Sequence, residues 1–150
     1  MHTVYNIVVT RPEKSPSQLL HEAGLRRTSV RLAVLAVIEQ SHQPLGAPQI
    51  LELLPQGIDR VTLYRTLNTL TGKKLLHRVR GDDQVWRYGF GQADAHASHS
   101  HAHFVCDKCG TVECLSEQPA PAAPKRTGVR AGYRVDYSEV LVHGACPDCR

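Results

Sequence analysis

The chain has no apolar run that approaches the roughly 20 residues needed to span a bilayer, although hydrophobic residues make up 41% of its 150 residues. Its opening stretch, MHTVYNIVVTRPEK, lacks the basic start, the long hydrophobic core and the small-residue cleavage site of a signal peptide. No H-E-x-x-H sequence occurs, so a metal site with an adjacent general base is not indicated. We therefore expect a cytoplasmic protein that is neither membrane-bound nor an enzyme.

In a reducing cytosol the five cysteines are expected to remain thiols. A chain of 150 residues can form one ordinary domain or two very small ones, and very small domains usually need a structural metal or another cross-link. Residues 1–91 hold 12 Lys and Arg against 7 Asp and Glu, whereas residues 92–150 hold 6 against 7. The basic first part fits either an ordinary solvated surface or a surface for nucleic acid.

Four stretches of the first part carry helix signals. In TSVRLAVLAVIEQS the apolar residues recur at i, i+3, i+4, i+7 and i+8 from Val30. Residues with this spacing lie along one face of a helix. Capping residues at the starts, with glycines or prolines at the ends, mark the bounds. The expected helices lie in SPSQLLHEAG, capped by Ser15 or Ser17; in TSVRLAVLAVIEQS, capped by Thr28 or Ser29; in APQILELLP; and in GIDRVTLYRTLNTLTG, opened by Asp59.

Two strand-like runs, KLLHRVR and QVWRYGF, follow the last helix and are separated by Gly81, Asp82 and Asp83, which is the signature of a hairpin. Helices followed by a hairpin give the order of a winged helix-turn-helix. In that fold the last helix enters the major groove of DNA with its N-terminal half, and we expect the hairpin to lie along the phosphate backbone.

This last helix supplies the candidate DNA contacts. We expect Val61, Leu67 and Leu70 to face the core. Arginine can bind guanine edges or phosphates, and threonine or tyrosine can contact a thymine methyl or a phosphate. The alternative is that the tyrosine packs in the core and the arginines are ordinary surface charge. The candidate DNA-binding residues are Arg60, Thr62, Tyr64 and Arg65 on the helix and Arg78 on the hairpin, where His77 and Arg80 add positive charge.

The second part is organised around two C-x-x-C pairs, Cys106 with Cys109 and Cys146 with Cys149, separated by 36 residues. Four thiolates complete the tetrahedral shell of Zn²⁺ with no open position, which predicts a structural site. Two disulfides or a thioredoxin-like dithiol are the alternatives. A reducing cytosol disfavours disulfides, and no β-α-β pattern surrounds either pair, as a thioredoxin-like dithiol would require. A zinc site here would hold the strands FVC, TVECL, YRVDY and EVLVHG in one small sheet.

A histidine-rich stretch precedes the first cysteine pair. On a strand, His99, His101 and His103 point to one side, so their imidazoles, with His96, are candidate ligands for a borderline metal ion. A low-complexity metal-scavenging stretch is the alternative. The fifth cysteine, Cys114, would favour Zn²⁺ over oxygen-seeking ions if it is a ligand, and is otherwise a small buried apolar residue.

These motifs together resemble the ferric uptake regulator (Fur) family of bacterial metal-responsive repressors. The resemblance rests on VTLYRTLNTL, the hairpin, HSHAHFVCDKCG and HGACPDC, and runs from about Gly24 to Arg150. It implies an α+β chain, with an N-terminal winged helix-turn-helix DNA-binding domain followed by a small α/β dimerisation and metal-binding domain. It also implies a homodimer that binds a palindromic double-stranded DNA operator when a regulatory metal at the hinge fixes the spacing of the DNA-binding domains.

Several residues match the family's functional positions. Tyr64 and Arg65 correspond to its DNA-contacting pair, and the four paired cysteines correspond to its structural zinc ligands. The regulatory positions are occupied by His77, His99, His101 and His103. Iron-sensing members carry acidic ligands where this chain has Arg87 and Cys114, which favours the zinc-sensing branch, the zinc uptake regulators (Zur), with Zn²⁺ as the second, regulatory metal.

The resemblance predicts an N-terminal extension at 1–15, a winged-helix domain at 16–91, a histidine-rich hinge and first strand at 92–105, and a zinc-binding dimerisation domain at 106–150. Pro119, Pro121 and Pro124 disfavour the helix that the family usually has there, so we expect a loop over 117–128. The predicted function is zinc-responsive repression of metal-uptake genes. Iron or other metal sensing in the same family is one alternative, and a metal-storage protein or zinc-dependent hydrolase is an alternative of another class.

Overall fold

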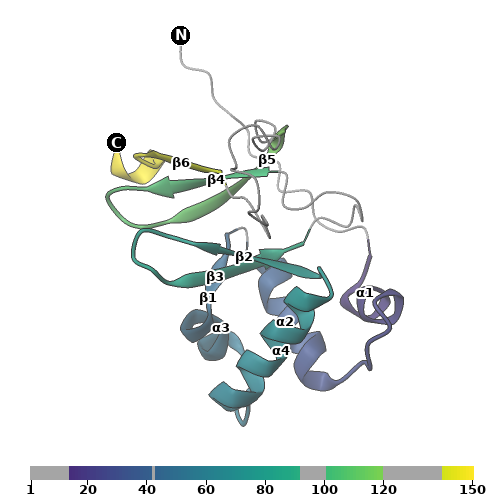
Figure 1. Ribbon diagram of the computed structural model, residues 1–150. Coiled ribbons are helices and arrows are strands. Elements are labelled where there is room, and N and C mark those ends of the chain that lie inside the picture. The colour runs from purple at the N-terminus through teal and green to yellow at the C-terminus, as the bar shows by residue number, and fades with distance from the viewer. Residues whose placement is uncertain (1–13, 42, 92–100, 120–139) are drawn as a thin grey trace, which may run out of the picture. The chain divides into compact units, whose positions relative to one another are not determined.

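The computed structural model describes residues 14–41, 43–91, 101–119 and 140–150. The described residues of 14–91 form one compact unit, and those of 101–150 form a second (Figure 1). Within these ranges no helix has both the length and the hydropathy that a membrane span requires. The predicted hinge histidines His96 and His99 lie outside the described residues, as does most of the proline-rich stretch.

Side-chain caps set the helix starts in the first unit. Ser15, Thr28 and Asp59 each accept a hydrogen bond from the backbone amide three residues further on. The sequence left two candidates for each of the first two caps, and the structure has Ser15 and Thr28. The helices are α1 (Pro16–Glu22), α2 (Ser29–Gln40), α3 (Ala47–Leu53) and α4 (Arg60–Gly72).

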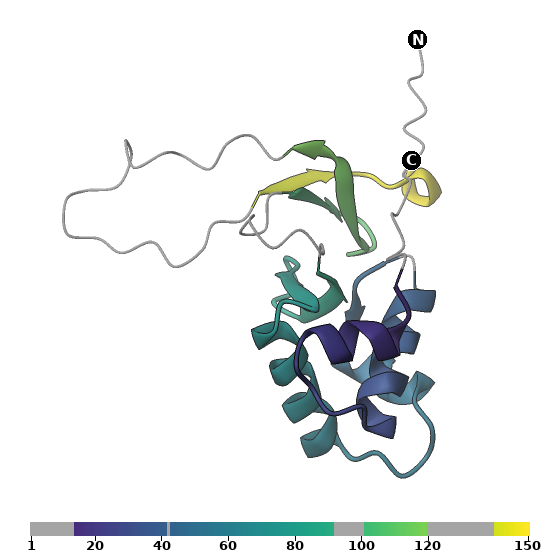
Figure 2. The ribbon, with the colours of Figure 1, turned by 90° about the vertical axis from the view of Figure 1, so that its right-hand side faces the viewer.

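A three-stranded antiparallel sheet completes the first unit, next to its helices (Figure 2). The predicted hairpin is confirmed as β2 (Leu76–Arg80) and β3 (Trp86–Phe90). A short strand, β1 (Leu45–Gly46), pairs with the other side of β3. β1 was not predicted from the sequence, because two residues are too few to produce a periodic pattern.

The core of the first unit lies between its four helices and the sheet. Leu35 is fully buried in it, although the predicted apolar face of α2 did not include this residue. Because α2 packs against α1, α3, α4 and β3, its buried face is wider than a single stripe. The core residues are Leu20, Val34, Leu35, Ile38, Ala47, Ile50, Leu54, Leu63, Leu67, Leu70, Leu76 and Tyr88.

One predicted core residue of α4 is wrong. Val61 was expected to face the core with Leu67 and Leu70, but it is 60% exposed. Nine residues, or about two and a half helical turns, separate Val61 from Leu70, so these two side chains lie on opposite sides of the helix. Leu63, which is 1% exposed, takes the inner position instead.

The second unit is a small mixed sheet. Its elements are β4 (His101–Cys106), β5 (Val112–Pro119), β6 (Leu141–Gly144) and a 3-10 turn, η1 (Pro147–Cys149). β4 lies in the centre, antiparallel to β5 and parallel to β6 (Figure 1). The predicted strands FVC and TVECL are confirmed, and EVLVHG is confirmed from Leu141 to Gly144; Glu139 and the run YRVDY lie outside the described residues.

The start of the proline-rich stretch differs from the prediction. Residues 117–119 belong to β5 instead of a loop. β5 is an edge strand of the described sheet, where Pro119 can end the strand without removing a hydrogen bond from the ladder. The remaining residues of the expected loop lie outside the described ranges.

Candidate metal centre and nucleic-acid interface

Two tight turns bring four cysteines of the second unit together. Cys106 ends β4, and the turn after it closes with a hydrogen bond from the Gly110 amide to the Cys106 carbonyl, with Gly110 at φ +73°. Cys146 and Cys149 flank the other turn, where the Cys149 amide donates to the Cys146 carbonyl. The Lys108 ammonium group ties the turns together by donating to the Cys149 carbonyl at 2.9 Å.

The four sulfur atoms fit a tetrahedral metal ion. All of them lie within 4.8 Å of one another. The sulfur atoms of Cys109 and Cys146 are 3.7 Å apart. A zinc–sulfur bond of about 2.3 Å gives tetrahedral sulfur–sulfur edges of about 3.8 Å. None of the four cysteines is in a disulfide, so the cluster suits a closed structural site, in agreement with the sequence spacing.

The local environment divides the four thiols into two kinds. Backbone amides of Cys109 and Cys146 donate hydrogen bonds that lower the pKa of Cys106 to about 6, and hydrogen bonding with Thr111 lowers the pKa of Cys109. Burial raises the pKa of Cys146, and a hydrogen bond to the Cys146 sulfur raises the pKa of Cys149 to about 12. Thiolates this close together repel one another, so all four ionise together only around a cation.

His103 and Cys114 lie opposite each other on β4 and β5. Opposed residues of antiparallel strands project from the same face, with Cβ atoms about 4.5–5.5 Å apart. His103 is 2% exposed. Burial, reinforced by the charge of Glu113, raises the pKa of the Cys114 thiol to about 12. The strand register therefore brings a nitrogen donor and a soft sulfur donor together, as the sequence predicted, one strand apart.

His77 lies on β2 in the first unit, opposite Gly89 on β3. Its Nδ1 pairs with the Phe90 carbonyl, which requires the proton on Nδ1; in the neutral ring the lone pair is then on Nε2. Metal-ligating histidines usually have this second hydrogen bond. A Cβ at position 89 would lie 2.9 Å from the His77 Cε1 atom, so glycine at this position leaves room for the ring.

The outer face of α4 carries the predicted DNA-binding residues. Arg60 and Arg65 are exposed. Tyr64 is 47% exposed, so the alternative in which it packs in the core is wrong. Thr62 is half-buried, and its amide and hydroxyl bind the Asp59 carboxylate at 2.8 and 3.0 Å. The Thr62 hydroxyl proton is therefore engaged in the helix cap.

The hairpin carries a stacked arrangement that the sequence analysis missed. The guanidinium carbons of Arg78 and Arg80 lie 4.6 and 5.4 Å from the centroid of the Trp86 ring. Arg80 lies opposite Trp86 in the hairpin register, and Arg78 is its diagonal neighbour. Cation–π attraction orders both exposed arginines on one face of the hairpin. The signal that could have found it is the spacing R-x-R on one strand opposite W on the next.

Arg87 also stays within the hairpin. The resemblance puts an acidic metal ligand at this position, but here a guanidinium group binds the Asp83 carboxylate by two bonds of 2.9 and 2.6 Å. The hydrogen bonds from Arg87 lower the pKa of Asp83 to about 2, and the same pairing raises the pKa of Arg87. This position therefore closes the hairpin turn and offers no oxygen ligand.

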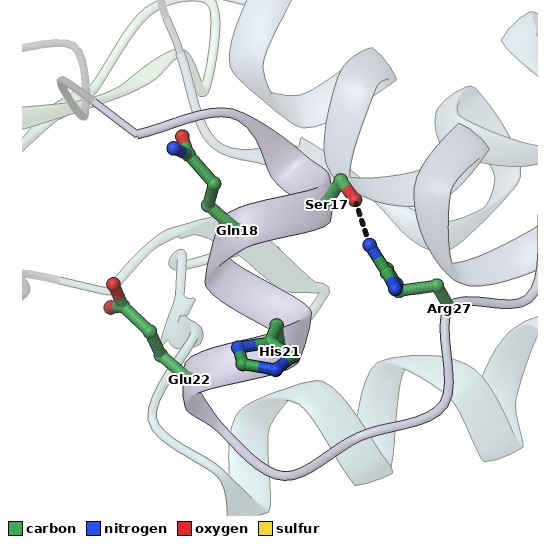
Figure 3. A pocket seen from close by; sticks show the side chains of 5 residues that line it. All are labelled: Ser17, Gln18, His21, Glu22 and Arg27. Carbon is green, nitrogen blue, oxygen red and sulfur yellow. Dashed lines mark hydrogen bonds between the residues drawn. The ribbon is translucent and has the colours of Figure 1, made fainter.

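A shallow hollow of about 310 Å³ lies beside α1 (Figure 3). In it the Arg27 guanidinium group donates to the Ser17 hydroxyl at 3.3 Å. The residues that line it are Ser17, Gln18, His21, Glu22 and Arg27. None of them is a predicted metal ligand or DNA-binding residue, so the hollow belongs to neither candidate site.

Comparison with known proteins covers most of the chain. The sequence profile of the ferric uptake regulator family matches residues 22–142. The ferric uptake regulation protein of Legionella pneumophila is 31% identical over 140 residues, which cover 89% of this chain and 98% of that protein. The zinc uptake regulation protein of Escherichia coli is 25% identical over 132 residues, which cover 85% and 75%. A solved zinc uptake regulator complexed with zinc and DNA has the same fold, with a TM-score of 0.65 at 20% identity over 88% of each chain.

Proposed function

Because the chain belongs to the ferric uptake regulator family, whose members are metal-responsive transcriptional regulators and not enzymes, we propose that it is a zinc-sensing repressor of metal-uptake genes. The active form is a homodimer that binds a palindromic operator in double-stranded DNA while a regulatory zinc ion is bound. A second zinc ion is structural and is held by Cys106, Cys109, Cys146 and Cys149, whose sulfur atoms have tetrahedral spacing.

The observation that carries the zinc assignment is the pairing of Cys114 with His103 across β4 and β5. Thiolate with imidazole is a donor pair suited to Zn²⁺, whereas carboxylates suit harder ions such as Mn²⁺. The Arg87–Asp83 pair supports the same assignment, because it removes an oxygen ligand from the family pattern. The proposed further regulatory ligands are His77, His96, His99 and His101.

The proposed DNA surface consists of α4 and the hairpin. In a winged helix-turn-helix the N-terminal residues of the recognition helix contact base edges. Tyr64 and Arg65, both exposed, would bind bases or phosphates there, and Arg60 and Thr62 lie in the same first turns. Arg78, on β2, would bind a phosphate beside the groove.

Metal binding and DNA binding are coupled in this proposal. The regulatory side chains bind one zinc ion, and the conformation of the protein with this ion bound is the one that binds the operator. The coupling is reciprocal, so operator DNA tightens zinc binding by the same factor by which zinc tightens DNA binding. A 100-fold coupling corresponds to about 2.7 kcal/mol.

The test is metal content measured on the same samples as DNA binding. We expect two zinc ions per chain, one of which leaves on mild chelation together with operator binding. Micromolar zinc should restore both. DNA binding that persists without the labile zinc, or that only iron or manganese restores, contradicts zinc sensing.

Two serine variants separate the two sites. C114S should retain one zinc per chain and its fold, but should lose zinc-dependent operator binding. C109S should lose the structural zinc and, with it, the folded second unit. A C114S protein whose DNA binding responds to zinc like the wild type would exclude Cys114 as a sensor ligand.

Iron sensing is the second candidate, because the relatives include ferric uptake regulation proteins. The ferric uptake regulation protein of L. pneumophila is more similar to this chain, at 31% identity, than the E. coli zinc regulator, at 25%. Adding back single metals to the chelated protein decides between zinc and iron sensing. For an iron sensor, iron(II) under anaerobic conditions would restore operator binding and zinc would not.

A further inference from the structure

Val61 is the most exposed large hydrophobic residue of α4. It is 60% exposed, and Tyr64, one turn later, is 47% exposed. Single exposed apolar residues are common on protein surfaces and need no explanation by themselves. The position of Val61 on the helix, however, points to a role in DNA binding.

Val61, Tyr64, Arg65 and Asn68 follow one another at i, i+3, i+4 and i+7, and all four are exposed. This spacing lies along one face of a helix. The opposite face is buried, as the 1% exposure of Leu63 and the complete burial of the inner leucines at positions 67 and 70 demonstrate. Val61 therefore belongs to the same surface as the proposed DNA contacts.

Val61 also lies at the leading end of that surface. α4 begins at Arg60, with Asp59 as its cap, so Val61 is the second helical residue. Val61 therefore precedes Tyr64 and Arg65 by about one turn on this face, and it lies nearer the N-terminal end of the helix. The N-terminal end of a recognition helix is the part that meets base edges.

Base edges in the major groove offer one apolar group, the C5 methyl of thymine. We propose that Val61 is a specificity-determining residue that packs against a thymine methyl in each operator half-site. DNA is the occupant that the surface favours, because the arginines at positions 60 and 65 flank Val61 and match a phosphate backbone. The inference rests on the proposed function as a DNA-binding repressor and adds a base preference to it.

The test removes either the thymine methyl group from the DNA or the methyl groups of Val61 from the protein. In vitro selection with the zinc-loaded full-length protein first defines a bound duplex, and each thymine is then replaced singly by uracil. At one thymine per half-site, the change to uracil should weaken wild-type binding about fourfold. This figure follows from the loss of about 0.8 kcal/mol when one buried methyl group is removed. V61A should bind the thymine duplex about as weakly as the wild type binds the uracil duplex, with no further loss on uracil.

L53A is the matched control, because Leu53 is also exposed, at 62%, but ends α3, outside the proposed DNA surface. It should respond to uracil as the wild type does. Thermal melting and zinc content show whether each variant is folded. The inference is overturned if V61A binds like the wild type, or if the loss on uracil is as large in V61A as in the wild type. Failure of the wild type to select any duplex with zinc would instead refute the proposed function.

Discussion

Replacing Trp86 with leucine should weaken operator binding without removing any charge. The Trp86 ring lies 4.6 Å from the guanidinium carbon of Arg78 and 5.4 Å from that of Arg80. Each exposed cation–π contact contributes about 0.5–1 kcal/mol, so the two together contribute about 1–2 kcal/mol. That free energy keeps two long side chains ordered before DNA arrives, which lowers the entropy cost of binding phosphates.

The expected loss for W86L is therefore about five- to thirtyfold in DNA affinity. The salt dependence should not change, because the number of arginines that meet phosphates is the same. R78A provides the contrast: it loses affinity and also reduces the slope of log K against log salt by about 0.9. W86F, with a smaller aromatic face, should fall between W86L and the wild type.

Fluorescence anisotropy of a labelled duplex, measured at four or five salt concentrations, gives both the affinity and the slope. Trp86 is the only tryptophan in the chain, so its own emission reports on the wild-type complex independently. Because Trp86 packs against the core, the melting temperature of each variant must be measured as well. W86L binding equal to the wild type, or a W86L slope as low as that of R78A, would refute the preordering argument.

The other predictions concern metal binding and the hairpin. C106S should lose the structural zinc and give an unfolded second unit, as measured by elemental analysis and circular dichroism; a folded zinc-free protein would contradict this. G89A should displace the His77 ring, because the new Cβ would lie 2.9 Å from its Cε1 atom. Binding of the labile zinc should weaken at least several-fold while the structural zinc stays, as calorimetric zinc titration would measure. Asp83 has its pKa lowered from 3.8 to about 2 by Arg87, so the stability from this pair is complete above about pH 4 and is lost as the pH falls toward 2. Because the carboxyl group is largely exposed, we expect less than about 1 kcal/mol from it, and R87A should return the NMR titration midpoint of Asp83 toward 3.8.

Local chemistry made much of the fold predictable from the sequence. The caps of α1, α2 and α4, the hairpin turn and the spacing of the cysteine pairs each depend on residues a few positions apart. The pairing of Cys114 with His103 was also predictable in outline, because a tight turn between two strands fixes which residues lie opposite each other.

The features that were missed depend on contacts between elements. Val61 was placed in the core because apolar residues recur through α4, and only the packing of α2 and β2 on that helix selects Leu63 over Val61. β1 exists because β3 offers it a free edge, which two residues of sequence do not reveal. The arginine stack on Trp86 depends on the strand register, which pairs residues of two different strands.

The first cysteine pair lies at the turn between β4 and β5, so one short segment both supplies two candidate ligands of the structural metal and sets the register of these strands. A slip of one residue would turn Cys114 to the opposite face from His103. In the proposed function the two metals load in a fixed order, because zinc bound by the four cysteines holds the turn that keeps Cys114 opposite His103. On the same proposal, a chain in which the four cysteines hold no zinc does not bind the operator in response to zinc, because its regulatory site has not formed.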